Sequence, residues 1–329
     1  MRMKILYAIQ GTGNGHVSRA REIIPHLQRY GDVELLISGT QSDVKLSQAL
    51  HYQLHGFSFI FGKKGGVDHW ETWKRMDLGR FLRDLRSLPL KSYDLIINDF
   101  EPVTAWACKV NKLESVGLSH QAAFQSDKVP RPKSFDWAQF VLKYYAPATN
   151  YIGLHFDRYD DYIHTPVIRS EIRALEVSND GHYTVYLPAI ADALIVPLLK
   201  KIPVRWEVFS KHSSTIYTDG NVSVSPIDNQ SYLRSLASCA GLFTGGGFEG
   251  PAEALYLGKK VLLAPMKYQY EQQCNAFALK QYGIPVIWGS DRNWLPSIIQ
   301  WVNSSQQIEL EFPDNAATIV DQLVNKYAR

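Results

Sequence analysis

Short apolar runs alternate with helical patterns along most of this chain, and that alternation limits its possible folds more than any other feature. The first unit consists of the apolar run Ile5–Ile9, a glycine-rich turn, and apolar residues at helical spacing between Val17 and Leu27. Gly31 then ends the helical pattern. Strands that alternate with helices in this way predict parallel sheets in an α/β fold.

The same pattern continues to the end of the chain. Further predicted strands are Val33–Ser38, Leu95–Asp99, Thr184–Leu187, Val204–Phe209, Leu242–Thr244, Val261–Leu263 and Val286–Trp288. Predicted helices in the second half are Ala252–Leu257, Gln272–Gln281 and the terminal helix Asn315–Tyr327. At about 100–200 residues per domain, 329 residues predict two domains. A polar segment between the halves places them at residues 1–165 and 166–329.

The composition excludes several classes of protein. A content of 45% hydrophobic and 20% charged residues is typical of a globular chain. No stretch approaches the ~18 apolar residues of a membrane span, and Ile5–Ile9 is too short for a signal-peptide core. Three cysteines without CxxC spacing indicate neither a disulfide framework nor a zinc site. They favour a cytoplasmic protein.

The first glycine-rich segment, GTGNGH at residues 11–16, joins the first predicted strand to its helix. Such a turn forms an anion site from backbone N–H groups, and we expect Gly13, Asn14 and Gly15 to line it. It departs from a dinucleotide fingerprint, because His16 stands where the third glycine belongs and the second strand ends without a carboxylate. No GxxxxGK[ST] motif occurs either. NAD and ATP are therefore poor candidate ligands.

His16 is a candidate catalytic base. At a helix N-terminus the helix dipole favours the neutral imidazole, which can act as a general base or simply cap the helix. Asp99 is expected at the same sheet edge. There it either orients His16, as the acidic residue of a catalytic triad does, or belongs to a strand-end turn with Glu101 and Pro102.

The second glycine-rich segment is Gly245–Gly247, directly after a predicted strand. Three glycines allow a phosphate to approach the backbone, and Glu253 lies a turn into the following helix, where a carboxylate can bind a ribose diol. Glu271 and Gln272 begin the next helix, at a position suited to holding sugar hydroxyls. Glu271 can alternatively serve only as a favourable charge in the first turn of that helix.

In these two blocks the chain resembles a known family. GTGNGHVSRA, together with TGGGFEGPAEALYLGKKVLLAPMKYQYEQQCNA, resembles the GT-B glycosyltransferases and among them the MurG-like family of peptidoglycan UDP-GlcNAc transferases. The resemblance implies two Rossmann-like domains whose parallel sheets face a cleft, with the C-terminal helix packing back. It also implies a nucleotide sugar on the C-terminal domain, an acceptor on the N-terminal domain, and neither metal nor cofactor.

The resemblance also assigns individual residues. The donor glutamate of the family lies six residues after the last loop glycine, which corresponds here to Gly247 and Glu253. The acidic–Gln pair of the family corresponds to Glu271 and Gln272, with glutamate in place of the common aspartate. A backbone contact to uracil falls near Ile227.

The spacing around Glu253 bears on stereochemistry. Retaining GT-B enzymes commonly carry two glutamates separated by seven residues, but Gly245 stands eight positions before Glu253. The resemblance therefore implies an inverting enzyme, in which His16 takes the proton of the acceptor hydroxyl in a single displacement.

The positive charge is concentrated in one segment. The net charge is +3 for the whole chain, and residues 1–165 carry 21 basic against 17 acidic side chains. The segment Gly62–Lys91 holds eight of these basic residues, namely Lys63, Lys64, Lys74, Arg75, Arg80, Arg83, Arg86 and Lys91. Such a segment is either a solvated amphipathic helix or a contact for anionic lipid. It is too short, and contains too many acids, to indicate nucleic-acid binding.

Together these features predict an inverting, metal-independent glycosyltransferase of the hexosyltransferase type. It uses a UDP-sugar and a carbohydrate or lipid-linked acceptor, in the cytoplasm or at the inner face of the membrane. Two alternatives remain open. The opening Gly13–Arg19 is also similar to that of a UDP-sugar hydrolase, so the chain can instead be a nucleotide-sugar hydrolase or epimerase of the same fold, or a catalytically silent nucleotide-sugar-binding protein.

Overall fold

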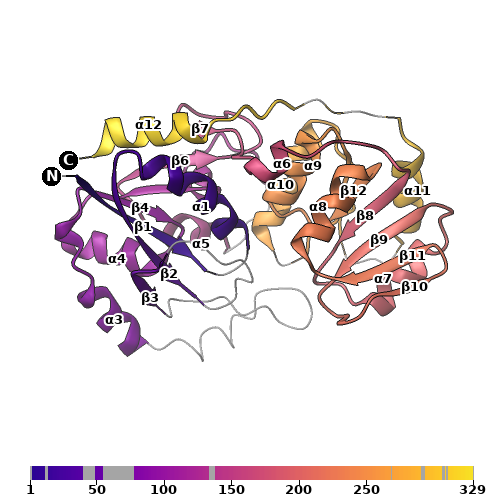
Figure 1. Cartoon of the computed structure of the whole chain (residues 1–329), viewed down its shortest axis with the longest axis horizontal. Helices are drawn as coiled ribbons and strands as arrows, with labels where there is room; N and C mark the ends of the chain where they lie inside the picture. The colour runs from indigo at the N-terminus through magenta and orange to yellow at the C-terminus, as the bar shows by residue number, and fades with distance from the viewer. Residues whose placement is uncertain are drawn as a thin grey trace.

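The protein has two lobes, each built around one sheet (Figure 1). The structure is a computed structural model, and it describes residues 2–11, 14–39, 49–54, 78–132, 138–267, 269–289, 293–305, 308 and 310–328.

The first sheet has seven strands in the spatial order β3-β2-β1-β4-β5-β6-β7. Every neighbouring pair is parallel. The strands are β1 (Met3–Gln10), β2 (Gly31–Ser38), β3 (Tyr52–Leu54), β4 (Leu95–Asp99), β5 (Val116–Ser119), β6 (Asn150–Leu154) and β7 (Ile163–His164).

The second sheet has six strands in the order β10-β11-β9-β8-β12-β13. Only the pair β10 and β11 is antiparallel. The strands are β8 (His182–Tyr186), β9 (Arg205–Ser210), β10 (Tyr217–Asp219), β11 (Val222–Pro226), β12 (Gly241–Thr244) and β13 (Lys260–Leu263).

Helices connect the strands of both sheets. In the first lobe they are α1 (Asn14–Leu27), α3 (Leu78–Ser87), α4 (Pro102–Asn111) and α5 (Ala138–Tyr144), with 3₁₀ turns η1 (Leu90–Ser92) and η2 (Gln121–Gln125). Beyond β7 they are α6 (Ser170–Arg173), α7 (Asp192–Leu199), α8 (Asn229–Ser238), α9 (Glu249–Tyr256), α10 (Tyr270–Gln281), α11 (Leu295–Asn303) and α12 (Ala316–Tyr327).

Both lobes have the Rossmann type of strand order. In each sheet the first strand of the lobe lies between its second and its fourth in chain order, apart from the added antiparallel edge strand β10. The direction of winding therefore reverses between β1 and β4 in one lobe and between β8 and β12 in the other. In open α/β sheets, ligands bind beyond the carboxyl ends of the strands at these reversal points.

The two faces of each sheet bury different side chains. In β1, Ile5, Tyr7 and Ile9 are fully buried in the hydrophobic cluster that contains α1 and α12. Leu6 and Ala8 are fully buried on the other face, in the cluster that contains α4. Burial on both faces explains why this strand is a continuous apolar run rather than an alternating one.

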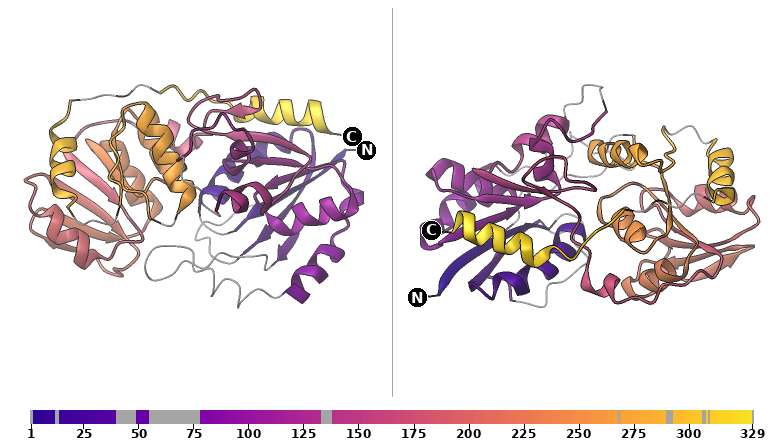
Figure 2. Two further views of the ribbon diagram at one scale, coloured as in Figure 1. Left: turned by 180° about the vertical axis from the view of Figure 1, so that it is seen from behind. Right: turned by 90° about the horizontal axis from the view of Figure 1, so that it is seen from above.

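The C-terminal helix crosses back from the second lobe to the first. Helix α12 packs against α1, and both chain ends lie together on the outer side of the first lobe (Figures 1 and 2). The Tyr30 hydroxyl after α1 donates a hydrogen bond of 2.5 Å to Asp321 Oδ1 on α12. The last helix thus completes the core of the domain that the chain builds first.

One predicted strand is wrong. The segment Val286–Trp288 forms only an isolated bridge, between Val286 and Leu263. Pro285 has no N–H to donate to a ladder, and Gly289 turns the chain at φ 87°. The other predicted strands and helices are present, with ends shifted by up to three residues.

Two further observations concern the chain as a whole. Within the described ranges, no helix is long and apolar enough to cross a membrane. Cys108, Cys239 and Cys274 are all buried.

We expect Leu323→Ala to lower the free energy of unfolding by ~2–5 kcal/mol, because Leu323 on α12 is fully buried against the first lobe. Urea denaturation followed by circular dichroism measures the change. The exposed Asn325→Ala, on the same helix, is the control. An equally small effect of both substitutions would show that α12 does not stabilise the fold.

Candidate active site

His16 and Asp99 meet where the first sheet reverses its winding. His16 is in the first turn of α1, directly after β1, and Asp99 is the last residue of the neighbouring strand β4. The register places Ile9 beside Asp99, so both chain segments leave the sheet at the same edge. His16 Nδ1 lies 2.6 Å from Asp99 Oδ1.

The environment of Asp99 assigns the proton of His16. Burial opposes ionisation of Asp99, but the Arg19 guanidinium and His16 outweigh it and hold the pKa of the carboxyl below its ordinary value. An ionised carboxylate at 2.6 Å accepts a hydrogen bond from an N–H on Nδ1, which leaves Nε2 as the proton acceptor. The His16 side chain is 12% exposed. An imidazole in this arrangement can take a proton from a molecule that reaches Nε2.

The strand-end turn after β4 is also present, but Asp99 does not form it. Asn98 Nδ2 donates to the Glu101 carbonyl, and the Glu101 N–H donates back to Asn98 Oδ1. Glu101 in turn caps α4, accepting from the N–H groups of Val103 and Thr104. The side chain of Asp99 is thereby directed at His16 rather than into the turn.

Arg19 holds Asp99 from the next turn of α1. Its Nη2 donates to Asp99 Oδ1 at 2.7 Å, and its Nε donates to Asp99 Oδ2 at 3.1 Å. The Tyr7 hydroxyl lies 3.5 Å from Oδ2. Both oxygens of a fully buried carboxylate are thus fixed by charged or polar donors.

The same arginine reaches the second lobe. Arg19 Nη1 donates to Glu249 Oε1 at 2.7 Å, and Glu249 is the first residue of α9, two positions after the second glycine segment. A Cβ added at Gly15 would lie 3.2 Å from Glu249 Cγ. The N-terminal ends of α1 and α9 therefore lie against each other. Burial is the main cause that raises the pKa of Glu249 to about 7.

The predicted ribose ligand Glu253 is held by Arg169. The two side chains form a two-pronged ion pair, with Nε 2.5 Å from Oε1 and Nη2 2.9 Å from Oε2. The Glu253 side chain is only 4% exposed. Burial raises the pKa of its carboxyl in spite of Arg169. Each carboxylate oxygen keeps further lone-pair capacity for a hydroxyl donor.

The other predicted donor residues lie at the carboxyl ends of β11, β12 and β13. Gly245–Gly247 follow β12, and Gly246 has φ 84°, a conformation that favours glycine. Gln272 Oε1, on α10, accepts from the Met266 N–H after β13. Ile227 directly follows β11 and is 37% exposed.

Glu271 is turned toward the first lobe. Gln121 Nε2 donates to Glu271 Oε2 at 3.1 Å, and His120 Nε2 lies 4.0 Å from Oε1. His120 also contacts Asn275 Oδ1 at 2.7 Å, and Asn275 Nδ2 donates to the Gly246 carbonyl. This chain of contacts connects the end of β5 to the second glycine segment.

An aromatic stack joins the lobes beside that chain. The rings of His120 and Phe248 are parallel, with an interplanar angle of 9° and centroids 3.9 Å apart. Phe156 lies 5.0 Å from Phe248, which is only 6% exposed. Phe248, the residue directly after the second glycine segment, thus packs against the first lobe.

Phe100 carries backbone strain next to the His16–Asp99 pair, called the dyad below. It has φ 56°, a conformation that bulky residues rarely adopt, and it directly follows Asp99. Its ring is nearly parallel to that of His16, with centroids 6.3 Å apart, and its centroid lies 4.9 Å from that of the Tyr145 ring. A small hollow of about 10 Å³ is lined by Asn98, Phe100, Gln121 and other residues. The strained residue thus places an aromatic wall beside the proton acceptor.

Some predicted residues lie outside the described part of the chain. They are Gly13, the side chain of Asn14, and residues 62–77 of the basic segment, including Lys63, Lys64, Lys74 and Arg75. The remainder of that segment contains the amphipathic helix α3, with Arg80, Arg83 and Arg86, and Leu82 is 43% exposed.

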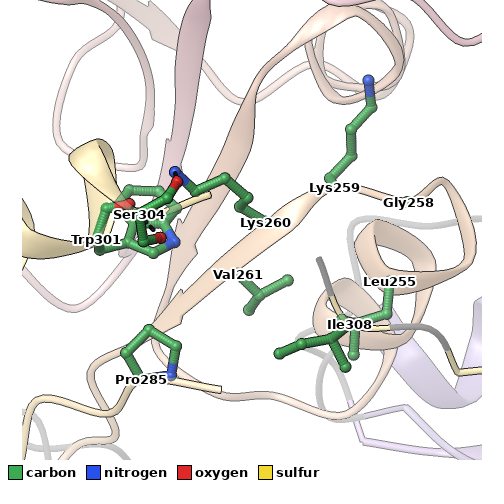
Figure 3. A pocket seen from close by; sticks show the side chains of 9 residues that line it. All are labelled: Leu255, Gly258, Lys259, Lys260, Val261, Pro285, Trp301, Ser304 and Ile308. Carbon is green, nitrogen blue, oxygen red and sulfur yellow. Dashed lines mark hydrogen bonds between the residues drawn. The ribbon is translucent and has the colours of Figure 1, made fainter. Parts of the chain in front are cut away.

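Two other hollows lie in the second lobe. One is at the amino end of β13, between Lys260, Val261 and Trp301 (Figure 3), and its volume of about 20 Å³ is far too small for a nucleotide. The second, of about 350 Å³, runs between β11 and α8, with Ser225 and Ser231 on either side of the Ile227 turn in sequence. Among the described residues, no group of three His, Cys, Asp or Glu side chains is arranged to hold a metal ion.

Sequence reasoning missed the residues that connect these groups. Arg19 lies three positions after His16 and therefore on the same helix face, a spacing that could have indicated it. Glu249, His120 and Arg169 are distant in sequence from their partners, so only the tertiary structure brings them in.

Comparison with known proteins identifies the fold and the family. The sequence profile of glycosyl transferase family 1 matches residues 3–299. No curated protein sequence matches the chain.

Many solved structures are similar to it, and three serve as examples. A UDP-glucosyltransferase from Polygonum tinctorium, in complex with 3,4-dichloroaniline, has a TM-score of 0.62 and 13% identity, covering 99% of this chain and 94% of that one. UGT89C1 from Arabidopsis thaliana, in complex with quercetin, has a TM-score of 0.61 and 12% identity, covering 99% of this chain and 94% of that one. MurG from Acinetobacter baumannii has a TM-score of 0.55 and 13% identity, covering 98% of this chain and 99% of that one. The expected GT-B fold and the MurG-like resemblance are confirmed.

We expect Arg169→Ala to lower the free energy of unfolding by about 3–5 kcal/mol, because it leaves the buried Glu253 carboxylate without its cation. Urea denaturation at neutral pH measures this loss, with the exposed Arg158→Ala as control. The double variant Arg169→Ala/Glu253→Gln should recover part of it, since no buried charge remains. A double variant no more stable than the single one would contradict this explanation.

Proposed function

The chain belongs to glycosyl transferase family 1 and is a glycosyltransferase, and from that premise we propose that it transfers a sugar from a UDP-sugar to an acceptor hydroxyl with inversion and without a metal ion. The observation that carries the proposal is the His16–Asp99 pair at the reversal point of the first sheet. Through Gly15 and Arg19, the same helix end contacts α9, directly after the second glycine segment. These contacts support a site in which the proton acceptor and the anion site lie side by side.

In the proposed reaction, His16 Nε2 accepts the proton of the acceptor hydroxyl. The acceptor oxygen forms a bond to the anomeric carbon as the bond from that carbon to UDP breaks, and UDP leaves with the electron pair. Asp99 stabilises the imidazolium that forms. Backbone N–H groups of Gly245–Gly247 and the N-terminus of α9 stabilise the charge on UDP.

We assign the donor to residues 166–329 and the acceptor to residues 1–165. Glu253, oriented by Arg169, is assigned to the ribose, and the backbone near Ile227 to the uracil. Glu271 and Gln272 at the start of α10 are assigned to the hydroxyls of the transferred sugar. The neighbours solved with UDP and UDP-L-rhamnose support a UDP-sugar donor. No cofactor besides this substrate enters the proposal.

The acceptor subsite is assigned to the side of the dyad that carries Phe100 and Tyr145. Two aromatic rings 4.9 Å apart favour an acceptor with an apolar or ring-shaped portion, such as a carbohydrate or a lipid-linked sugar. The arginines of α3 lie on this same lobe and are assigned to contact with anionic lipid.

We expect UDP-sugars to raise the melting temperature, whereas NAD(P) and ATP leave it unchanged. A thermal-shift panel identifies the donor, and a UDP-release assay with that donor measures turnover. Release of free sugar without any acceptor, at a rate that acceptors do not increase, would favour the hydrolase. Stabilisation only by NAD(P) or ATP would contradict the proposal.

His16→Ala should lower turnover by about 10²–10⁴-fold while the thermal shift with UDP is retained. The loss follows from removal of the proton acceptor, which does not contact the assigned nucleotide subsites. UDP release, measured for the variant and the wild type with the same donor and acceptor, quantifies it. Unchanged turnover in an active protein would exclude His16 as the base. If neither the wild type nor the variant turns over a UDP-sugar that it binds, the silent binding protein is favoured.

The lipid contact of α3 has its own test. We expect the protein to float with vesicles containing anionic lipid and not with neutral vesicles, and Arg83→Glu/Arg86→Glu to weaken flotation severalfold. Lys211→Glu, an exposed charge reversal on the second lobe, is the control. Flotation that is indifferent to lipid charge would make α3 an ordinary solvated helix.

A further inference from the structure

We infer that Glu249, on the donor domain, is a positioning residue for the catalytic base on the acceptor domain, acting through Arg19. This inference rests on the proposed role of His16 as the base. It means that the base has its full strength only where α9 lies against α1.

The geometry forms one continuous chain of contacts. His16 Nδ1 contacts Asp99 Oδ1 at 2.6 Å, and Arg19 holds the two oxygens of Asp99 with Nη2 and Nε. The remaining prong, Nη1, donates to Glu249 Oε1 at 2.7 Å. The Arg19 side chain is only 2% exposed, whereas that of Glu249 is 21% exposed. A planar guanidinium can hold both oxygens of Asp99 and donate to Glu249 at the same time, a geometry that a lysine does not reproduce.

The charges explain why the second carboxylate matters. Without Glu249, the positive charge of Arg19 would cancel the negative charge of Asp99. His16 would then lose most of the anionic field that favours its protonated form. With Glu249 ionised, the three side chains carry a net charge of −1 beside the imidazole. The imidazolium that forms during transfer is then stabilised, and low exposure keeps the interaction from being screened.

The surroundings of Glu249 determine how its ionisation affects stability. The groups that face it are Arg19, Glu253, Arg169 and Asp99. Burial, opposed by Arg19, moves its pKa from 4.5 to about 7. A carboxyl whose pKa is raised in the folded protein favours folding when neutral, and this contribution is lost as the pH rises from 4.5 to 7. The ionised residue therefore costs stability at neutral pH.

The experiment is an NMR titration of the His16 ring in ¹⁵N-histidine-labelled protein, with His16→Gln used to identify its signals among the ten histidines. We expect Glu249→Gln to lower the pH midpoint of the His16 titration by about 0.5–1 unit. Glu249→Asp, which keeps the charge, should stay near the wild type. The control is Glu22→Gln. Glu22 lies on α1, the helix of His16, and its carboxylate accepts a hydrogen bond from the Ser170 hydroxyl.

Stability and turnover provide the second readout. Glu249→Gln should have a melting temperature at least equal to that of the wild type above pH 7, with the difference developing between about pH 4.5 and 7. Its turnover should fall about 3- to 10-fold, in proportion to the weaker base. A lower melting temperature with an unchanged His16 midpoint would show an ordinary structural ion pair and overturn the inference. A midpoint in Glu249→Asp as low as in Glu249→Gln would also overturn it.

The two proposals fail in different ways. If no UDP-sugar is turned over by the wild type, the proposed function is wrong, and the NMR titration still measures the coupling. If UDP-sugars are turned over and Glu249→Gln behaves as Glu22→Gln does, the coupling is wrong and the proposed function stands.

Discussion

The structure depends on one buried carboxylate. Asp99 is fully buried at the end of a central strand, and an ionised group there requires compensation from every side. His16 and Arg19, one turn apart on α1, and the Tyr7 hydroxyl of β1 supply that compensation. Because the guanidinium of Arg19 has a further prong, the same requirement extends to Glu249 and joins the two domains. Orientation of the base and contact between the lobes thus have a common physical origin.

The topology explains why this arrangement needs few residues. The central strands of both sheets follow the Rossmann type of order, so each sheet has a reversal point. The proposed base and the glycine segment for the donor lie at these two points. Phe248 and the His120–Asn275 contact fasten the lobes beside the site, while α12 returns to complete the first core. The two sheets and their helices thus position two short segments, the loop before His16 and Gly245–Gly247, relative to each other.

The sequence predicted the parts of the structure that are local. Apolar runs, glycine turns and helical spacing are set by neighbouring residues. Seven of the thirteen strands in the described residues, both glycine segments and the presence of two domains could therefore be inferred. Among the described residues, six strands were missed, namely β3, β5, β6, β7, β10 and β11. Their runs have only two to five residues, and Val116–Ser119, for example, contains glycine and serine. Val286–Trp288 was assigned as a strand on its apolar residues, although Pro285 limits pairing.

At the site, sequence reasoning indicated His16 and Asp99 from their positions at a sheet edge. It could not indicate Glu249 or Arg169, whose partners lie 230 and 84 positions away. Nor could it show that Phe100 adopts a positive φ, because a bulky residue rarely has that conformation. Long-range electrostatic pairing and backbone strain leave no periodic pattern in a single sequence.

The account centres on one base, His16, acting in a single displacement, and the configuration of the first-formed product tests this most directly. We would follow the anomeric proton by ¹H NMR during turnover of an α-linked UDP-sugar, whether the acceptor is a hydroxyl compound or water. The account predicts that the β-anomer forms first. An α-configured first product would contradict it, because retention requires two displacements or a mechanism without His16 as base.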